Sequence, residues 1–132
     1  MPFNTTTLNS VEHENKNANN INNIFDVTTK PLIMDADTGG KIEHFQLNVK
    51  SMERLGISAV IIEDKKGLKK NSLFSNTSDQ IQEDKTKFSE KIQVGKKAQR
   101  SNEFMIIARI ESFILGKDVK DAINRANSYV DA

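Results

Sequence analysis

Acidic residues follow three apolar runs of this sequence. Asp35 and Asp37 come after the first run, Glu63 after the second, and Arg109 and Glu111 close the third. Carboxylate oxygens are the ligands that Mg²⁺ prefers, and the planar guanidinium of arginine suits oxyanions such as phosphoryl groups. Any one acidic residue after a strand is commonly a helix cap or a solvated loop residue. Repetition after three runs favours one site that holds a divalent cation or a shared proton.

A second group of polar residues follows Glu63 directly. Residues 63–72 combine carboxylates, lysines, an amide and a hydroxyl, with Lys69, Asn71 and Ser72 at the far end and Gly67 between. A solvated basic loop is the simplest interpretation of these residue types. If the segment opens from the edge where the acidic residues lie, it instead supplies donors to the same site.

The apolar runs predict the elements that position these residues. Residues 31–34, 57–62 and 104–110 are rich in β-branched residues and predict strands covered on both faces. Apolar residues at steps of three and four predict a helix before each later strand. The first pattern is Phe45, Val49 and Met52, and the second is Ile81, Phe88 and Ile92 before Gly95. Helical connections make the strands parallel, so their carboxyl ends share one edge.

A last helix is predicted at the C-terminal end of the sequence. Asp118 is a plausible N-cap, and Asp121 follows three residues later. The apolar residues expected on its buried face are Val119, Ala122, Ile123, Ala126 and Val130. The predicted order is therefore β-α-β-loop-α-β-α, which fits either a doubly wound sheet or a piece of a (β/α)₈ barrel.

The first 26 residues differ in composition from residues 27–132. Asparagine and threonine are frequent there, and few apolar residues are available to bury. Such a segment gains little from ordering, so we expect a flexible arm with a short helix near residues 21–25.

Composition excludes several classes of protein. The chain has 132 residues, 36% of them hydrophobic, which suffices for one small domain. With 19 basic and 18 acidic residues it has no long basic stripe, so neither nucleic acid nor a membrane surface is a predicted partner. It contains no cysteine, no apolar run long enough to cross a bilayer and no secretory signal. We therefore expect a cytoplasmic protein.

The acidic and basic motifs together resemble the phosphoenolpyruvate mutase family of the isocitrate lyase superfamily. The matching motifs are residues 35–40 (Asp-Ala-Asp-Thr-Gly-Gly), residues 63–65 (Glu-Asp-Lys) with the loop ending at Asn71-Ser72, and residues 108–112 (Ala-Arg-Ile-Glu-Ser). The resemblance covers roughly residues 28–132 and implies an α/β fold of the TIM type. A complete barrel takes about 250 residues, so we expect an incomplete segment of about three to four βα units, from a truncated or partial chain.

The resemblance also implies roles for the residues. It implies Mg²⁺ as the cofactor, with Asp35 as its nearest ligand and Asp37 and Glu63 holding its waters. Lys69 and Asn71 would be catalytic residues on a loop that closes over the substrate, and Ser72 would also bind substrate. Arg109 would be a catalytic residue that binds the phosphoryl group, with Glu111 supporting it. Family features that we do not find here are an early Ser-Gly-Leu segment, a further aspartate and a later histidine.

The activity that the resemblance implies is the interconversion of phosphoenolpyruvate and phosphonopyruvate, a step of phosphonate biosynthesis. The lyases of the superfamily carry a catalytic cysteine on the mobile loop, so the absence of cysteine disfavours that activity. A phosphonopyruvate hydrolase and a non-catalytic barrel remnant that acts as a binding or scaffold segment stay open as alternatives. The expected partner is a small-molecule substrate, and the full-length protein is expected to be a homo-oligomer.

Overall fold

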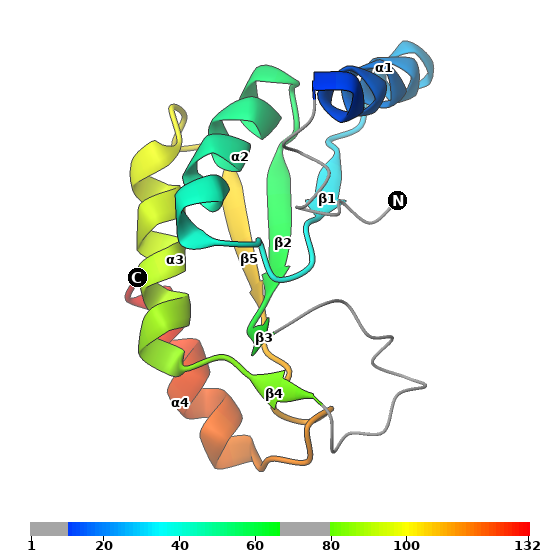
Figure 1. Ribbon diagram of the computed structural model, residues 1–132. Helices are drawn as coiled ribbons and strands as arrows, with labels where there is room; N and C mark the ends of the chain where they lie inside the picture. Colours follow the sequence, from blue (N-terminus) through cyan, green and yellow to red (C-terminus); the bar gives the residue numbers. More distant parts are fainter. Residues whose placement is uncertain (1–10, 67–79) are drawn as a thin grey trace.

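The computed structural model describes residues 11–66 and 80–132, which form one α/β unit (Figure 1). Its elements are, in chain order, α1 (Val11–Val27), β1 (Ile33–Asp35), α2 (Ile42–Arg54), β2 (Ala59–Glu63), β3 (Lys65–Lys66), β4 (Ile81–Gln82), α3 (Lys85–Ala98), β5 (Met105–Arg109) and α4 (Val119–Val130).

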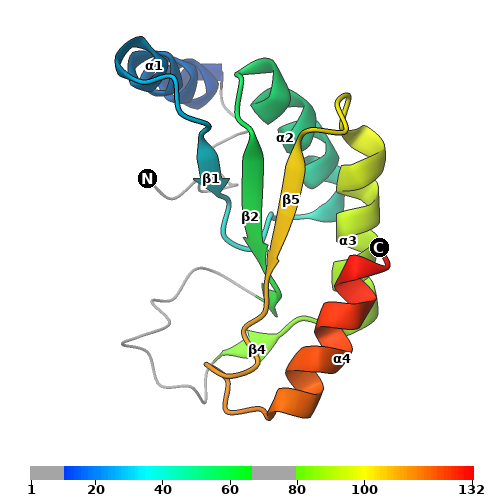
Figure 2. The same cartoon turned by 180° about the vertical axis from the view of Figure 1, so that it is seen from behind.

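The main sheet has the strand order β1-β2-β5, and both pairings are parallel, as predicted. Helices α2 and α3 cover one face, and Figure 2 shows the opposite face with no described helix in front of it. On strands β1 and β5, Ile33 and Met105 are 52% and 55% exposed. The sequence predicts strands covered on both faces. In the described residues this holds for the central strand β2, whereas β1 and β5 are partly exposed, because both long helices that connect the strands lie on the same side.

The core lies between the sheet and helices α2 and α3. Phe45 and Val49 of α2 and Phe88 of α3 are completely buried, which confirms the helical pattern of the sequence. Gly95 lies inside α3 and does not end it as predicted. A Cβ atom at Gly95 would lie 2.6 Å from Phe45 Cε1 and 2.7 Å from Ile106 Cδ1, so only glycine permits this close packing of α2, α3 and β5.

Helix α3 begins later than the sequence pattern indicates. Asp84 caps it by accepting a hydrogen bond from the Lys87 backbone N–H at 3.1 Å. Ile81 lies in β4 and is 62% exposed, so it is not part of the helix face as predicted. The pair formed by β3 and β4 is antiparallel and was not predicted, since strands of two residues carry no recognisable periodicity.

Helix α4 begins at the predicted N-cap but buries a different face. The Asp118 carboxylate accepts a hydrogen bond from the Asp121 backbone N–H at 2.9 Å. The predicted buried face was wrong for three residues, since Val119, Ile123 and Val130 are 59%, 55% and 84% exposed. The buried residues of α4 are Ala122, Arg125 and Tyr129.

Helix α1 is longer than the short helix expected near residues 21–25. Ile21 is 4% exposed and joins the core, and the Phe25 ring lies close to Gly56. The flexibility of residues 1–26 stays a prediction. Within residues 11–66 and 80–132, no helix has the length and apolar character needed to span a membrane.

Candidate functional site

Three predicted site residues meet at the carboxyl end of the sheet. Glu63 and Arg109 are register partners at the ends of β2 and β5, and Asp35 ends β1. The Arg109 guanidinium contacts the Glu63 carboxylate through Nη2, and its Nη1 lies 3.4 Å from Asp35 Oδ2. Its Nε donates a hydrogen bond to Glu111 Oε1 at 3.0 Å, the pairing expected from the sequence. The three strand ends therefore converge, as parallel strands require.

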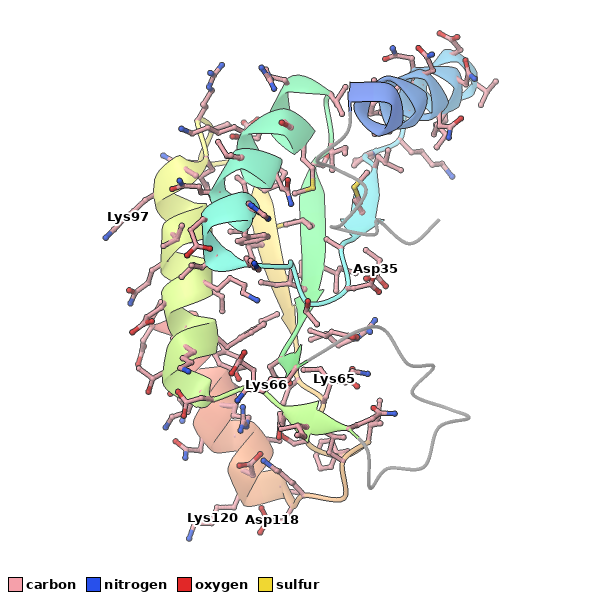
Figure 3. All side chains as sticks on the ribbon, viewed as in Figure 1. Asp35, Lys65, Lys66, Lys97, Asp118 and Lys120 are labelled. Atoms are coloured by element: carbon pink, nitrogen blue, oxygen red, sulfur yellow. The ribbon has the colours of Figure 1, made fainter. Side chains whose placement is uncertain are left out.

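A buried lysine completes this cluster of charges. Lys65 Nζ lies 3.5 Å from Glu63 Oε1 and 3.5 Å from Glu111 Oε2, and it donates a hydrogen bond to Gln80 Oε1 at 3.2 Å. Figure 3 shows Lys65 and Asp35 at the same end of the sheet. Three carboxylates thus surround two cations. Because Glu63, Glu111 and Lys65 are nearly inaccessible to solvent, each charge needs the others as partners.

The turn between β1 and α2 places Asp37 beside this cluster. Asp37 has φ of 52°, its backbone N–H donates to Asp35 Oδ1 at 3.0 Å, and its carbonyl accepts from the Glu63 N–H at 2.7 Å. Lys91 of α3 donates to the Thr38 carbonyl at 2.8 Å, and burial lowers the pKa of its amine. The turn is therefore held to both β2 and α3.

The chemistry of these donors fits Mg²⁺. The predicted ligands Asp35, Asp37 and Glu63 offer only carboxylate oxygens, which suit a hard cation. The Arg109 guanidinium contacts two of these carboxylates, Asp35 and Glu63, so the negative charge there already stabilises a positive charge. In this arrangement, no three acidic or histidine side chains of the described residues are grouped so that they could hold a metal ion. Their roles as ligands stay a prediction.

The remaining predicted residues, Lys69, Asn71 and Ser72, lie outside the described residues. Their roles as catalytic and substrate-binding residues also stay predictions.

A second polar cluster, behind the site, was missed by the sequence analysis. Its centre is the completely buried Asp64, which contacts Arg125 and Tyr129 of α4. Burial raises the pKa of the Tyr129 phenol, and the hydrogen bond to Asp64 raises it further, so the phenol is a neutral donor at physiological pH. The available signal was the spacing of Asp121, Arg125 and Tyr129 at steps of four, which places them on one face of a helix.

Comparisons with known proteins show which proteins the chain is similar to. A family model described as phosphoenolpyruvate phosphomutase matches residues 9–132. The phosphoenolpyruvate phosphomutase of Tetrahymena pyriformis is 34% identical over 108 residues, covering 81% of this chain and 36% of that relative. The chain therefore spans little more than a third of the length of this curated relative.

Solved structures extend the comparison to the fold. The crystal structure of phosphoenolpyruvate phosphomutase from Streptomyces platensis subsp. rosaceus superposes with a TM-score of 0.80 at 33% identity, covering 89% of this chain and 41% of that one. Phosphonopyruvate hydrolase in complex with oxalate and Mg²⁺ gives a TM-score of 0.72 at 27% identity, covering 89% of this chain and 39% of that one. The parallel sheet with alternating helices thus corresponds to part of a TIM-type barrel. The chain belongs to the phosphoenolpyruvate mutase family of the phosphoenolpyruvate mutase/isocitrate lyase superfamily.

Proposed function

We propose that this chain supplies part of the active site of a phosphoenolpyruvate phosphomutase, which interconverts phosphonopyruvate and phosphoenolpyruvate. In this reaction the bond between C3 and phosphorus breaks, and phosphorus bonds to the enolate oxygen at C2. No atom enters or leaves, so the protein has to hold the enolate and the phosphoryl group in place. Positioning and complementary charge supply most of the catalysis of such transfers.

The observation that carries this proposal is the environment of Arg109. Its side chain is 43% exposed, whereas the carboxylates of Glu63 and Glu111 that contact it are 4% and 1% exposed. The buried carboxylates hold the guanidinium at the strand end while part of it stays accessible to an incoming oxyanion. A planar guanidinium can donate two parallel hydrogen bonds to phosphoryl oxygens, which suits the charge on a transferring phosphoryl group.

Asp35, Asp37 and Glu63 would hold Mg²⁺ in this proposal, directly or through water. Held by these carboxylates, Mg²⁺ would supply positive charge for the enolate oxygen. Asp35 is the best ligand of the three, because its side chain is 42% exposed and its partner Arg109 lies 3.4 Å away. Glu63 is buried against Arg109 and Lys65, which favours a role in orienting metal-bound water.

Lys69 and Asn71 complete the proposal as loop residues that exclude water from the intermediate. Water admitted at this stage attacks phosphorus, and the enolate then takes a proton at C3. The products are pyruvate and inorganic phosphate, and this reaction is the phosphonopyruvate hydrolase alternative.

Phosphorus NMR tests the proposal directly. Because this chain supplies only part of the barrel, the assay uses the full-length form of the protein; with phosphonopyruvate and Mg²⁺ we expect the ³¹P signal of phosphoenolpyruvate to appear. Inorganic phosphate with pyruvate would identify a hydrolase instead. If neither product forms, the catalytic proposal is refuted for this chain, and the binding or scaffold alternative is favoured.

Two variants that each remove one positive charge make the test specific. Arg109→Gln should lower turnover by about two to three orders of magnitude, the range for losing one donor to transition-state charge. Lys97→Gln is the matched control, because Lys97 is exposed on α3 and lies far from Asp35 in Figure 3. Equal turnover in the two variants would contradict the role of Arg109.

A further inference from the structure

Asp64 lies between two residues of the charged cluster but faces away from it. Asp64 lies at the bend between β2 and β3, and its contacts show the direction of its side chain: Glu63 and Lys65 contact Arg109 and Glu111, whereas the Asp64 carboxylate contacts Arg125 and Tyr129 of α4. The side chain of Asp64 is completely buried. A buried carboxylate is costly unless its oxygens are paired, so the arrangement of its partners is informative.

Four donors from three segments converge on the Asp64 carboxylate. The Glu111 backbone N–H donates to Oδ1 at 2.8 Å. Oδ2 accepts from the Tyr129 hydroxyl at 2.7 Å, from Gln82 Nε2 at 3.0 Å and from Arg125 Nη1 at 3.2 Å. The carboxylate therefore joins the end of β2 to β4, to α4 and to the segment after β5, which lie together at the lower end of the molecule in Figures 1 and 2.

The backbone of Asp64 adds two more links. Its N–H donates to the Arg109 carbonyl at 3.1 Å, and its carbonyl accepts from the Glu83 N–H at 2.9 Å. Asp64 thus bonds the backbone of Arg109 through its own backbone and the backbone of Glu111 through its side chain. The backbones of Arg109 and Glu111 are therefore fixed in register with Glu63 and Lys65.

Helix α4 supports this carboxylate with partners that are fixed in turn. Arg125 Nη1 donates to the Tyr129 hydroxyl at 3.1 Å, and Arg125 Nε donates to Asp121 Oδ2 at 3.0 Å. Asp121 Oδ2 also accepts from the Ser112 hydroxyl at 2.7 Å. Among the described residues, the side chains of Arg125 and Tyr129 make polar contacts with Asp64, Glu83, Asp121 and each other but not with the charged cluster itself. Any effect they have on the cluster therefore passes through Asp64, through Glu83, or through Asp121 and Ser112, the neighbour of Glu111.

We propose that Asp64, with Arg125 and Tyr129, is a positioning cluster that sets Arg109 and Glu111 against Glu63 and Lys65. This inference rests on the proposed function, because it concerns the same charged site. Six hydrogen bonds to Asp64 hold the backbone around Arg109 and Glu111 in place. Displacing a substrate-binding group by about 1 Å can reduce turnover about 100-fold, so this positioning of Arg109 affects the rate of the proposed reaction. Tyr129 and Arg125 are positioning residues, not catalytic residues.

The test follows an NMR signal of the Arg109 side chain, which would not change if Tyr129 and Asp64 only stabilised the fold. Tyr129→Phe removes one donor to Asp64 while keeping the ring that packs on Phe88 at a centroid distance of 4.8 Å. The readout is the Nε–H cross-peak of Arg109 in a ¹⁵N spectrum, assigned by its disappearance in Arg109→Lys. We expect Tyr129→Phe and Asp64→Asn to shift or broaden this peak in the folded protein.

Ser128→Ala is the matched control, since it removes a hydroxyl from the same helix that donates only within α4, to the Asn124 carbonyl. It should leave the Arg109 peak in place. The proposal is overturned if Tyr129→Phe lowers the unfolding temperature but leaves the peak as in the unmodified chain. If Asp64→Asn does not fold, Tyr129→Phe alone decides. Absence of turnover would count against the proposed function and would not change the outcome of this test.

Discussion

Replacing Gly95 by alanine tests whether the packing between α2, α3 and β5 is as tight as the structure indicates. The added Cβ would lie 2.6 Å from Phe45 Cε1 and 2.7 Å from Ile106 Cδ1, and Phe45 is completely buried. Overfilling a packed core costs about 1 to 3 kcal/mol, whereas alanine gains about 1 kcal/mol over glycine in a helix interior. Because both distances are below 3 Å, the cost should lie in the upper part of this range, about 2 to 3 kcal/mol, so we expect the free energy of unfolding of Gly95→Ala to fall by about 1 to 2 kcal/mol.

The clash with Ile106 also places strain on β5, the strand that ends at Arg109. Thermal unfolding should show a midpoint lowered by about 3 to 8 °C for a chain of this size. Ile106→Val deletes the Cδ1 atom that the new Cβ meets, so it should relieve part of the strain.

A double-mutant cycle makes this reasoning refutable. The combined variant, Gly95→Ala with Ile106→Val, should be more stable than the sum of the single effects predicts, by about 0.5 kcal/mol or more. Additive effects would show that the two atoms do not compete for the same space. An unchanged or raised midpoint in Gly95→Ala alone would refute the packing argument altogether.

Three further predictions concern the site and its surroundings. Asn71→Ala should lower turnover of phosphonopyruvate by about two to three orders of magnitude with a smaller change in KM, and an unchanged turnover would remove Asn71 from the catalytic residues. The hydrogen bond from Ser112, with the charge of Arg125, lowers the pKa of the Asp121 carboxyl, so its contribution to stability is present above about pH 4 and is lost as the pH falls through the lowered pKa. Urea unfolding between pH 5 and pH 2.5 should therefore show a loss of stability that is smaller in Asp121→Asn, and equal losses would contradict this. Arg109→Gln removes the cation beside Asp35 and Glu63, so calorimetry should show Mg²⁺ binding tightened by about tenfold, and weaker binding would mean that Arg109 does not compete with the metal.

The convergence of Asp35, Glu63 and Arg109 was predictable from the sequence because it follows from strand direction alone. Helical patterns between apolar runs make the strands parallel, and parallel strands place their carboxyl ends on one edge. No knowledge of side-chain packing was needed for that step. The roles of these residues require chemistry that strand order does not specify.

The buried face of α4 was not predictable from hydrophobicity. Val119 and Ile123 are more apolar than Arg125 and Tyr129, yet the polar pair is buried and the apolar pair is exposed. The reason is Asp64, whose buried carboxylate requires donors, and the polar face of α4 supplies two of its four. Sequence patterns do not reveal which strand-end carboxylate faces the helix.

The central claim is that the strand-end carboxylates hold Mg²⁺ for an oxyanion that Arg109 binds, and calorimetry with oxalate tests it most directly. Oxalate is a planar dianion that resembles the enolate of pyruvate. We predict that the chain binds oxalate only when Mg²⁺ is present and that Asp35→Asn abolishes this binding. Asp118→Asn, the same change at the far end of α4 in Figure 3, should leave it intact. Oxalate binding that needs no Mg²⁺, or that persists unchanged in Asp35→Asn, would contradict the account.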